Sequence, residues 1–123
     1  MAREVLKSRT KEYAHRCVKA ALAVEQKGKL GKLISYQLMR SSTSVAANYR
    51  AVCLAHSTDA FAAKLSIVIE ELDESAFWIT FALDENLFEK NRVIELLSEA
   101  KEMLAMFIAS RKTIQLKKKA KKE

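Results

Sequence analysis

Proline is absent from this chain of 123 residues, and glycine occurs only twice, at Gly28 and Gly31. Folds built from β-strands need many turns, and glycine and proline supply much of their chemistry. Their scarcity argues against sandwiches, barrels and hairpin arrays, and it favours long helices joined by a few short loops. Because 50% of the residues are hydrophobic, the chain can bury a core and is not disordered as a whole. Its length fits a single domain.

Apolar residues recur every three or four positions in four segments, which is the pattern of amphipathic helices. Gly28 and Gly31 separate the first two segments, Ser57 suits the N-cap of the third, and Asn86 with Glu89 resembles a capping box for the fourth. The serine- and alanine-rich run at 41–47 has poor helix propensity, but the apolar period continues through it. The sequence therefore predicts helices over about 4–27, 31–55, 58–84 and 87–114.

Short connections between the four segments predict an all-α fold, an up-down-up-down antiparallel four-helix bundle. We expect the bundle to cover residues 1–116, followed by a basic disordered tail at 117–123. The apolar stripes of the third and fourth segments are wider than one bundle core requires, which favours self-association over a thicker core.

The chain has no apolar run of the ~20 residues needed to span a bilayer, and its first residues lack an apolar signal-peptide core. We therefore expect a cytoplasmic protein with no membrane role. Cys17 and Cys53 are isolated in helical segments. Both are expected to be reduced and packed as small apolar groups rather than to form a disulfide or a metal site.

The net charge of +7 is unevenly distributed. Residues 57–86 carry one basic and seven acidic side chains, whereas residues 30–56 carry three basic side chains and no acid. We expect the acidic segment to pair with basic neighbours inside the fold. The remaining basic surface is expected either to attract a polyanion by counterion release or only to keep a small protein soluble.

The acidic cluster at 70–74 is the first candidate for chemistry, because carboxylates stacked on one helix face must be compensated. A di-iron bundle needs Glu-x-x-His on two helices, and the chain has one such motif, at 12–15. No metal or cofactor is therefore expected, and arginines of the second segment are the expected partners. Asn48 is expected to fix helix register against a carboxylate, or less readily to face a ligand. The predicted polar network comprises Arg40, Asn48, Arg50, Glu71 and Glu74.

Catalysis is not indicated by any motif. The serines lack a base and a glycine-rich oxyanion turn, and the segment between Gly28 and Gly31 lacks the spacing of a phosphate-binding loop. His15 and His56 are expected at the surface. We therefore expect a protein that is not an enzyme.

Basic residues on the first segment and in the tail could contact phosphates without sequence specificity. Aromatic residues make up only 7% of the chain and lie mostly in core stripes, so no stacking platform for single strands is expected. The candidate nucleic-acid-binding residues are Lys7, Arg9, Lys11, Arg16, Lys19, Lys117, Lys118, Lys119, Lys121 and Lys122.

Two motifs resemble a known bacterial family. Residues 37–51, QLMRSSTSVAANYRA, resemble the second-helix signature of the four-helix-bundle proteins encoded in 23S rRNA intervening sequences. The resemblance continues through Ser57, DAF at 59–61, KL at 64–65, Ile67, EELDES at 70–75 and FW at 77–78, and it extends over about residues 8–113. Many members have Glu-Gly shortly after the asparagine, where this chain has Arg50 and Ala51.

The resemblance implies a bundle that assembles as a ring-like homopentamer. A related protein is the accessory factor of diversity-generating retroelements, a basic pentameric bundle that binds a reverse transcriptase and its RNA. By this likeness the chain is expected to be an oligomeric, nucleic-acid-associated protein that binds RNA. The alternative is a protein-interaction scaffold or adaptor, for example for a polymerase such as a reverse transcriptase, with no direct role in nucleic-acid binding.

Overall fold

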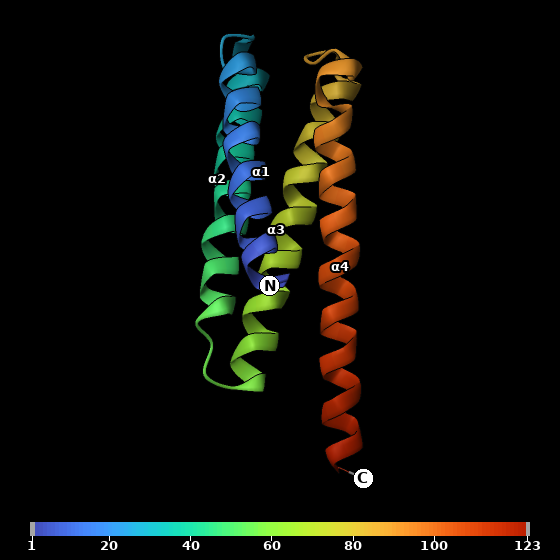
Figure 1. Cartoon of the computed structure of the whole chain (residues 1–123). Coiled ribbons are helices and arrows are strands. Elements are labelled where there is room, and N and C mark those ends of the chain that lie inside the picture. The colour runs from blue at the N-terminus through green and yellow to red at the C-terminus, as the bar shows by residue number, and fades with distance from the viewer. Residues whose placement is uncertain (1, 123) are drawn as a thin grey trace.

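The computed structural model describes residues 2–122 and contains four α-helices. They are α1 (Ala2–Val24), α2 (Gly28–Cys53), α3 (Thr58–Asp84) and α4 (Lys90–Lys122). Successive helices run antiparallel, in the predicted up-down-up-down order (Figure 1). The described residues contain no strand, and the prediction of an all-α four-helix bundle is confirmed.

The turn between α1 and α2 depends on both glycines. Gly28 has a φ of +75°, a backbone conformation that glycine adopts without strain. Gly31 lies against the end of α1, because a Cβ atom at this position would be 2.1 Å from the carbonyl oxygen of Val24. Only a residue without a side chain fits this approach.

The hydroxyl-rich middle of α2 is helical despite its poor propensity, and its hydroxyl groups are satisfied within the helix by backbone carbonyls of the preceding turn. Ser41 Oγ donates to the Gln37 carbonyl at 2.8 Å, and Thr43 Oγ1 donates to the Met39 carbonyl at 2.7 Å. Ser41 and Ser42 are fully buried, so these small residues let the neighbouring helices approach α2 closely.

Ser57 is the N-cap of α3, as predicted, and its Oγ accepts a hydrogen bond from the Ala60 N–H. Asn86 has a φ of +60° at the other end of α3. The Asn86 N–H donates to the Leu83 carbonyl at 3.0 Å, and the Leu87 N–H donates to the Ala82 carbonyl at 2.8 Å. This is the Schellman pattern of a helix C-terminus. The predicted capping box is therefore wrong, because Asn86 ends α3 and α4 begins only at Lys90.

The last helix is longer than predicted. It continues to Lys122, so residues 117–122 are helical rather than a disordered tail, and residue 123 lies outside the described residues. Figure 1 shows that the end of α4 projects past the α2–α3 loop, whereas α1 begins part-way along the bundle. Lysine, alanine and glutamine have good helix propensity, and lysine at a helix C-terminus is favoured by the helix dipole.

The hydrophobic core runs along the bundle axis and receives side chains from all four helices. Tyr13, Leu38, Leu72, Met103 and Phe107 are among its largest members, and each is almost completely buried. A smaller cluster of Val24, Ile34 and Ala82 closes the end that carries the α1–α2 loop. The helices α1 and α4 contact each other less than the pairs that follow one another in sequence.

Candidate nucleic-acid interface

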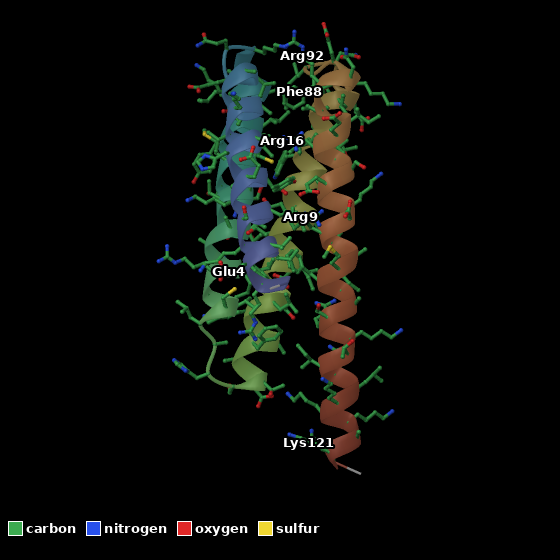
Figure 2. All side chains as sticks on the ribbon, viewed as in Figure 1. Glu4, Arg9, Arg16, Phe88, Arg92 and Lys121 are labelled. Carbon is green, nitrogen blue, oxygen red and sulfur yellow. The ribbon has the colours of Figure 1, made fainter. Side chains whose placement is uncertain are left out.

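Two of the predicted phosphate contacts instead join α1 to α4. The Arg9 guanidinium holds Glu99 through two hydrogen bonds, from Nε at 3.0 Å and from Nη2 at 2.6 Å, and it also pairs with Glu102 at 3.2 Å. The hydrogen bonds from Arg9 hold the pKa of Glu99 below its usual range. Arg16 lies 3.9 Å from Glu95. Figure 2 labels Arg9 and Arg16. These arginines bridge the least extensive helix contact of the bundle.

The other predicted residues of α1 are free of such pairs. Lys7, Lys11 and Lys19 are exposed, and none forms an ion pair with a carboxylate among residues 2–122. Together with Arg3 and His15, these three lysines form a series with a spacing of four residues. Five basic or ionisable side chains therefore follow one ridge of the helix.

The C-terminal lysines lie on the projecting end of α4, where Figure 2 labels Lys121. Lys117, Lys118 and Lys121 line a groove of about 780 Å³ at this end of the bundle, while Lys119 and Lys122 are exposed and do not line it. Lys118 pairs with Asp59 at the start of α3, and its hydrogen bond lowers the pKa of Asp59.

Three other groups in this groove were missed by sequence reasoning. Arg3 lies with its guanidinium carbon 5.5 Å from the ring centroid of Phe61, and His56 is an exposed loop residue. No local motif marks them, because they come together only when α1, the α2–α3 loop, the start of α3 and α4 meet. We call this site the end groove. The complete lining is Arg3, Ala55, His56, Ser57, Thr58, Asp59, Phe61, Ser110, Thr113, Ile114, Lys117, Lys118 and Lys121.

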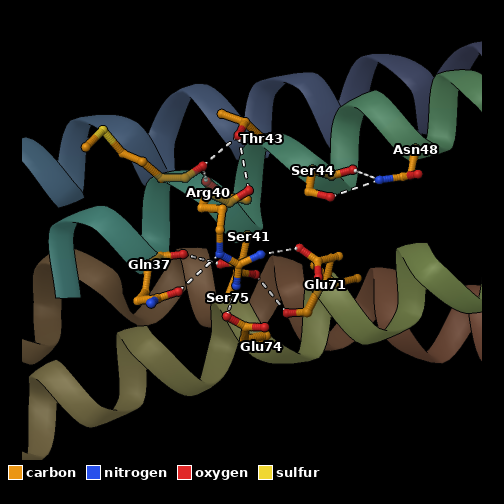
Figure 3. A network of polar contacts seen from close by, with 12 residues as sticks. Gln37, Arg40, Ser41, Thr43, Ser44, Asn48, Glu71, Glu74 and Ser75 are labelled. Atoms are coloured by element: carbon orange, nitrogen blue, oxygen red, sulfur yellow. Dashed lines mark hydrogen bonds and ion pairs between the residues drawn. The ribbon is translucent and has the colours of Figure 1, made fainter. Parts of the chain in front are cut away.

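The predicted polar network forms only in part (Figure 3). Arg40 bonds to Glu71 at 3.1 Å and also pairs with Glu74, so a basic residue of α2 compensates the acidic cluster of α3. Glu74 also accepts a hydrogen bond from Trp78 Nε1 at 3.1 Å. Burial acts to raise the pKa of Glu74, but the hydrogen bonds from Trp78 and Arg40 outweigh it and leave the pKa lowered.

The other two members of the predicted network do not join it. Asn48 Nδ2 donates to the carbonyl and to the Oγ of Ser44, both at 2.9 Å, and therefore bonds within its own helix. Arg50 is exposed and pairs with no carboxylate among the described residues. The prediction was wrong for both residues, because neither position faces the acidic cluster of α3.

A polar pair lies inside the core. Tyr13 Oη and Ser75 Oγ are 2.7 Å apart, and the Ser75 hydroxyl also donates to the Leu72 carbonyl. Cys17 is completely buried, and burial raises its pKa to about 12. The thiol is therefore protonated at neutral pH and is not a nucleophile.

Two further observations concern residues 2–122. Nowhere in this range do three histidine, cysteine, aspartate or glutamate side chains come together in a way that could hold a metal ion. None of the four described helices contains a stretch that is long and apolar enough to cross a membrane.

An aromatic patch lies on the outside of the α2–α3 pair. The ring centroids of Phe77 and Trp78 are 5.0 Å apart, and those of Phe77 and Phe81 are 5.8 Å apart. Phe77 is 53% exposed, and Tyr36 of α2 is 62% exposed. Because α2 and α3 are antiparallel and Arg40 lies opposite Glu71 and Glu74, Tyr36 is at the level of Phe77. We call Phe77, Trp78 and Phe81 the aromatic patch.

Comparisons with known proteins support the resemblance seen in the sequence. The family model for 23S rRNA-intervening sequence proteins matches residues 6–109. The chain is also similar to a crystal structure of a protein of unknown function from the S23 ribosomal protein family of Bacteroides thetaiotaomicron, with 26% sequence identity and a TM-score of 0.83. That similarity covers 91% of this chain and 99% of the other. Among curated proteins, none matches the chain. The protein therefore belongs to the 23S rRNA-intervening sequence protein family.

Proposed function

We propose that this chain is a non-enzymatic protein that binds RNA and acts as a homo-oligomer. The observation that carries the proposal is the large excess of uncompensated basic side chains. Of the 22 lysines and arginines, only Arg9, Arg16, Arg40, Arg92 and Lys118 pair with carboxylates of residues 2–122. A surface of this kind gains free energy from a polyanion by releasing counterions.

RNA is favoured over other polyanions by the likeness to the accessory factor of diversity-generating retroelements, because the family's own name describes where its members are encoded rather than what they bind. The arrangement of the basic residues also suits a phosphate backbone. The series on α1 and the projecting end of α4 present rows of lysines rather than an isolated charge, and rows of this kind contact phosphates without reading bases.

Fluorescence anisotropy with labelled RNA and DNA of equal length tests the proposal at about 0.05 M and about 0.15 M salt. We expect affinity that prefers RNA and persists at the higher salt. The triple variant K7Q/K11Q/K19Q removes three charges from α1 and should weaken binding, whereas K29Q/K32Q/K90Q removes three exposed charges near the other loops and serves as the control. Equal affinity for RNA and DNA, lost at the higher salt, would contradict a function in RNA binding.

The oligomer is supported by the aromatic patch, since a monomer seldom exposes neighbouring aromatic side chains. A second copy of the chain is the proposed occupant, and the family resemblance implies a ring of five copies. If the protein is a monomer in solution, the patch is instead available to another protein. The scaffold function would then be favoured over the RNA-binding oligomer.

A further inference from the structure

The end groove exists because two neighbouring helices differ in length. Helix α1 has 23 residues and α4 has 33, which corresponds to about 35 Å and about 50 Å at ~1.5 Å per residue. The last turns of α4 therefore continue beyond the start of α1 (Figure 1). Beside the middle of α4 the neighbouring space is filled by α1. At the projecting end of α4 none of the described helices fills that space, which leaves the groove of about 780 Å³.

The core-facing stripe of α4 changes from apolar to mostly polar and basic residues beyond the point where α1 packs against it. Along most of the bundle the stripe alternates steps of three and four residues and is buried and apolar, at Val93, Leu96, Ala100, Met103 and Phe107. The same steps continue into the groove at Ser110, Ile114, Lys117 and Lys121. If α1 were longer, it would need apolar residues on this part of α4 to pack against. The stripe has lysines there instead.

The opposite wall adds further positive charge. Arg3 lies over the Phe61 ring, and His56, Ser57 and Thr58 contribute polar side chains from the α2–α3 loop and the start of α3. Four lysine or arginine side chains thus line the groove against one carboxylate, that of Asp59, which is already paired with Lys118.

We propose that the end groove binds a linear chain of phosphate groups, supplied by a single strand of RNA, with Lys117, Lys121 and Arg3 as its free cationic contacts. The inference rests on the proposed function and assigns the RNA strand a place on the molecule. The groove volume is in the range of ligand pockets, which suits a few nucleotides of one strand rather than a duplex.

An acidic amphipathic helix from another protein fits the groove less well. Such a helix anchors through a row of apolar residues at i, i+3, i+4 and i+7, which needs a matching apolar surface. Ile114 is the one large apolar residue that α4 contributes to the groove, and Phe61 is covered by Arg3. The lysines are mostly solvent-exposed, as is typical of phosphate contacts.

The variant K117Q/K118Q/K121Q tests the proposal against the control K29Q/K32Q/K90Q, which removes the same charge near the other end of the bundle. The two sets lie much farther apart than the ~8 Å over which charges act at physiological salt. For a short labelled single-stranded RNA, the groove variant should bind about tenfold more weakly, and the slope of log affinity against log salt should fall by about 1.4 in magnitude, because two of the three free contacts are lost. The control should bind like the wild type.

A second variant acts in the opposite direction. D59N removes the carboxylate from the groove and releases Lys118, so it should bind the RNA about threefold more tightly than the wild type. A loss of folding cannot imitate a gain in affinity. Circular dichroism of each variant shows whether the helices are intact.

The outcomes distinguish a failure of the groove proposal from a failure of the proposed RNA-binding function. RNA affinity that falls in K7Q/K11Q/K19Q but not in the groove variant would overturn the groove and leave the proposed function standing. Absence of RNA binding by the wild type would overturn the proposed function. A parallel titration with inorganic polyphosphate then shows whether the groove lysines bind phosphate chains from another source. Tighter, groove-dependent binding of a labelled glutamate-rich helical peptide than of RNA would overturn the phosphate proposal.

Discussion

At the scale of single residues, Gly31 decides how closely α1 and α2 can meet. A Cβ atom would lie 2.1 Å from the Val24 carbonyl oxygen, which is a backbone atom and cannot rotate away. We expect Gly31→Ala to lower the free energy of unfolding by about 2 kcal/mol or more, because the turn between the helices must shift. Urea unfolding followed by circular dichroism measures the change, with the exposed Lys32→Ala as control. A change in Gly31→Ala no larger than that of the control would show that the turn adapts without cost.

Cys17 and Cys53 should differ sharply in reactivity. Burial raises the pKa of Cys17 to about 12 and removes the thiol from solvent, whereas Cys53 is only partly buried. In native protein at pH ~8, iodoacetamide should therefore modify Cys53 first, and Cys17 only after unfolding. Peptide mass spectrometry over a time course distinguishes the two sites. Equal rates in the folded protein would mean that the core opens around Cys17.

At the scale of helices, the Arg9–Glu99 pair makes the α1–α4 contact sensitive to acid. The pKa of Glu99 is lowered in the folded state, so its contribution is present above the carboxyl pKa of the unfolded chain, near 4.3. That contribution is lost as the pH falls through the lower pKa of the folded state. Both side chains are about one quarter exposed, which suggests a contribution of about 1 kcal/mol.

Glu99→Gln tests this contact. The variant should be less stable than the wild type at pH ~7, and the difference should shrink below pH ~4. Urea unfolding at both pH values measures it, with Glu95→Gln as a matched change, because Glu95 is largely exposed and lies farther from its arginine. A difference that does not depend on pH would contradict the ionic origin of the contribution.

The sequence predicted the helices well because each carries a long, regular apolar stripe, and Ser57 was identified as an N-cap from its residue type alone. The end of α4 was misjudged for a physical reason. Residues 117–122 have no apolar face, so their pattern predicts a disordered tail, but they extend a helix that is already formed and therefore do not need a new nucleus. Asn86 was assigned to the wrong helix because asparagine suits both an N-cap and a left-handed C-terminal position.

At the scale of the whole molecule, the aromatic patch should control the oligomeric state. F77S/F81S should convert the proposed oligomer to smaller species, because it removes the exposed aromatic surface of α3. The control L22S/L54S changes exposed apolar residues elsewhere. Native mass spectrometry and light scattering give the subunit number. A wild-type monomer at micromolar concentration would contradict the oligomer.

The sequence predicted the candidate site only in part. It shows which residues are charged, but it does not show which residues lie next to them in the fold. Arg9 and Arg16 resembled free phosphate contacts until the fold placed them against Glu99 and Glu95. The two arginines are seven residues apart on one face of α1, and glutamates occur on α4, the helix expected beside it. This pattern could have indicated ion pairs between the two helices. Arg3 carried no comparable signal, because its place in the groove depends on where α1 begins relative to α4.

RNA binding by this basic bundle is tested most directly by the salt dependence of RNA affinity in the wild-type protein. Anisotropy titrations of one single-stranded RNA and the matching DNA across about 0.05–0.3 M salt give both affinity and slope. We expect tighter binding of RNA than of DNA at every salt concentration, with a linear fall of log affinity that corresponds to several phosphate contacts. Binding that is weak at physiological salt and equal for both polymers would contradict it.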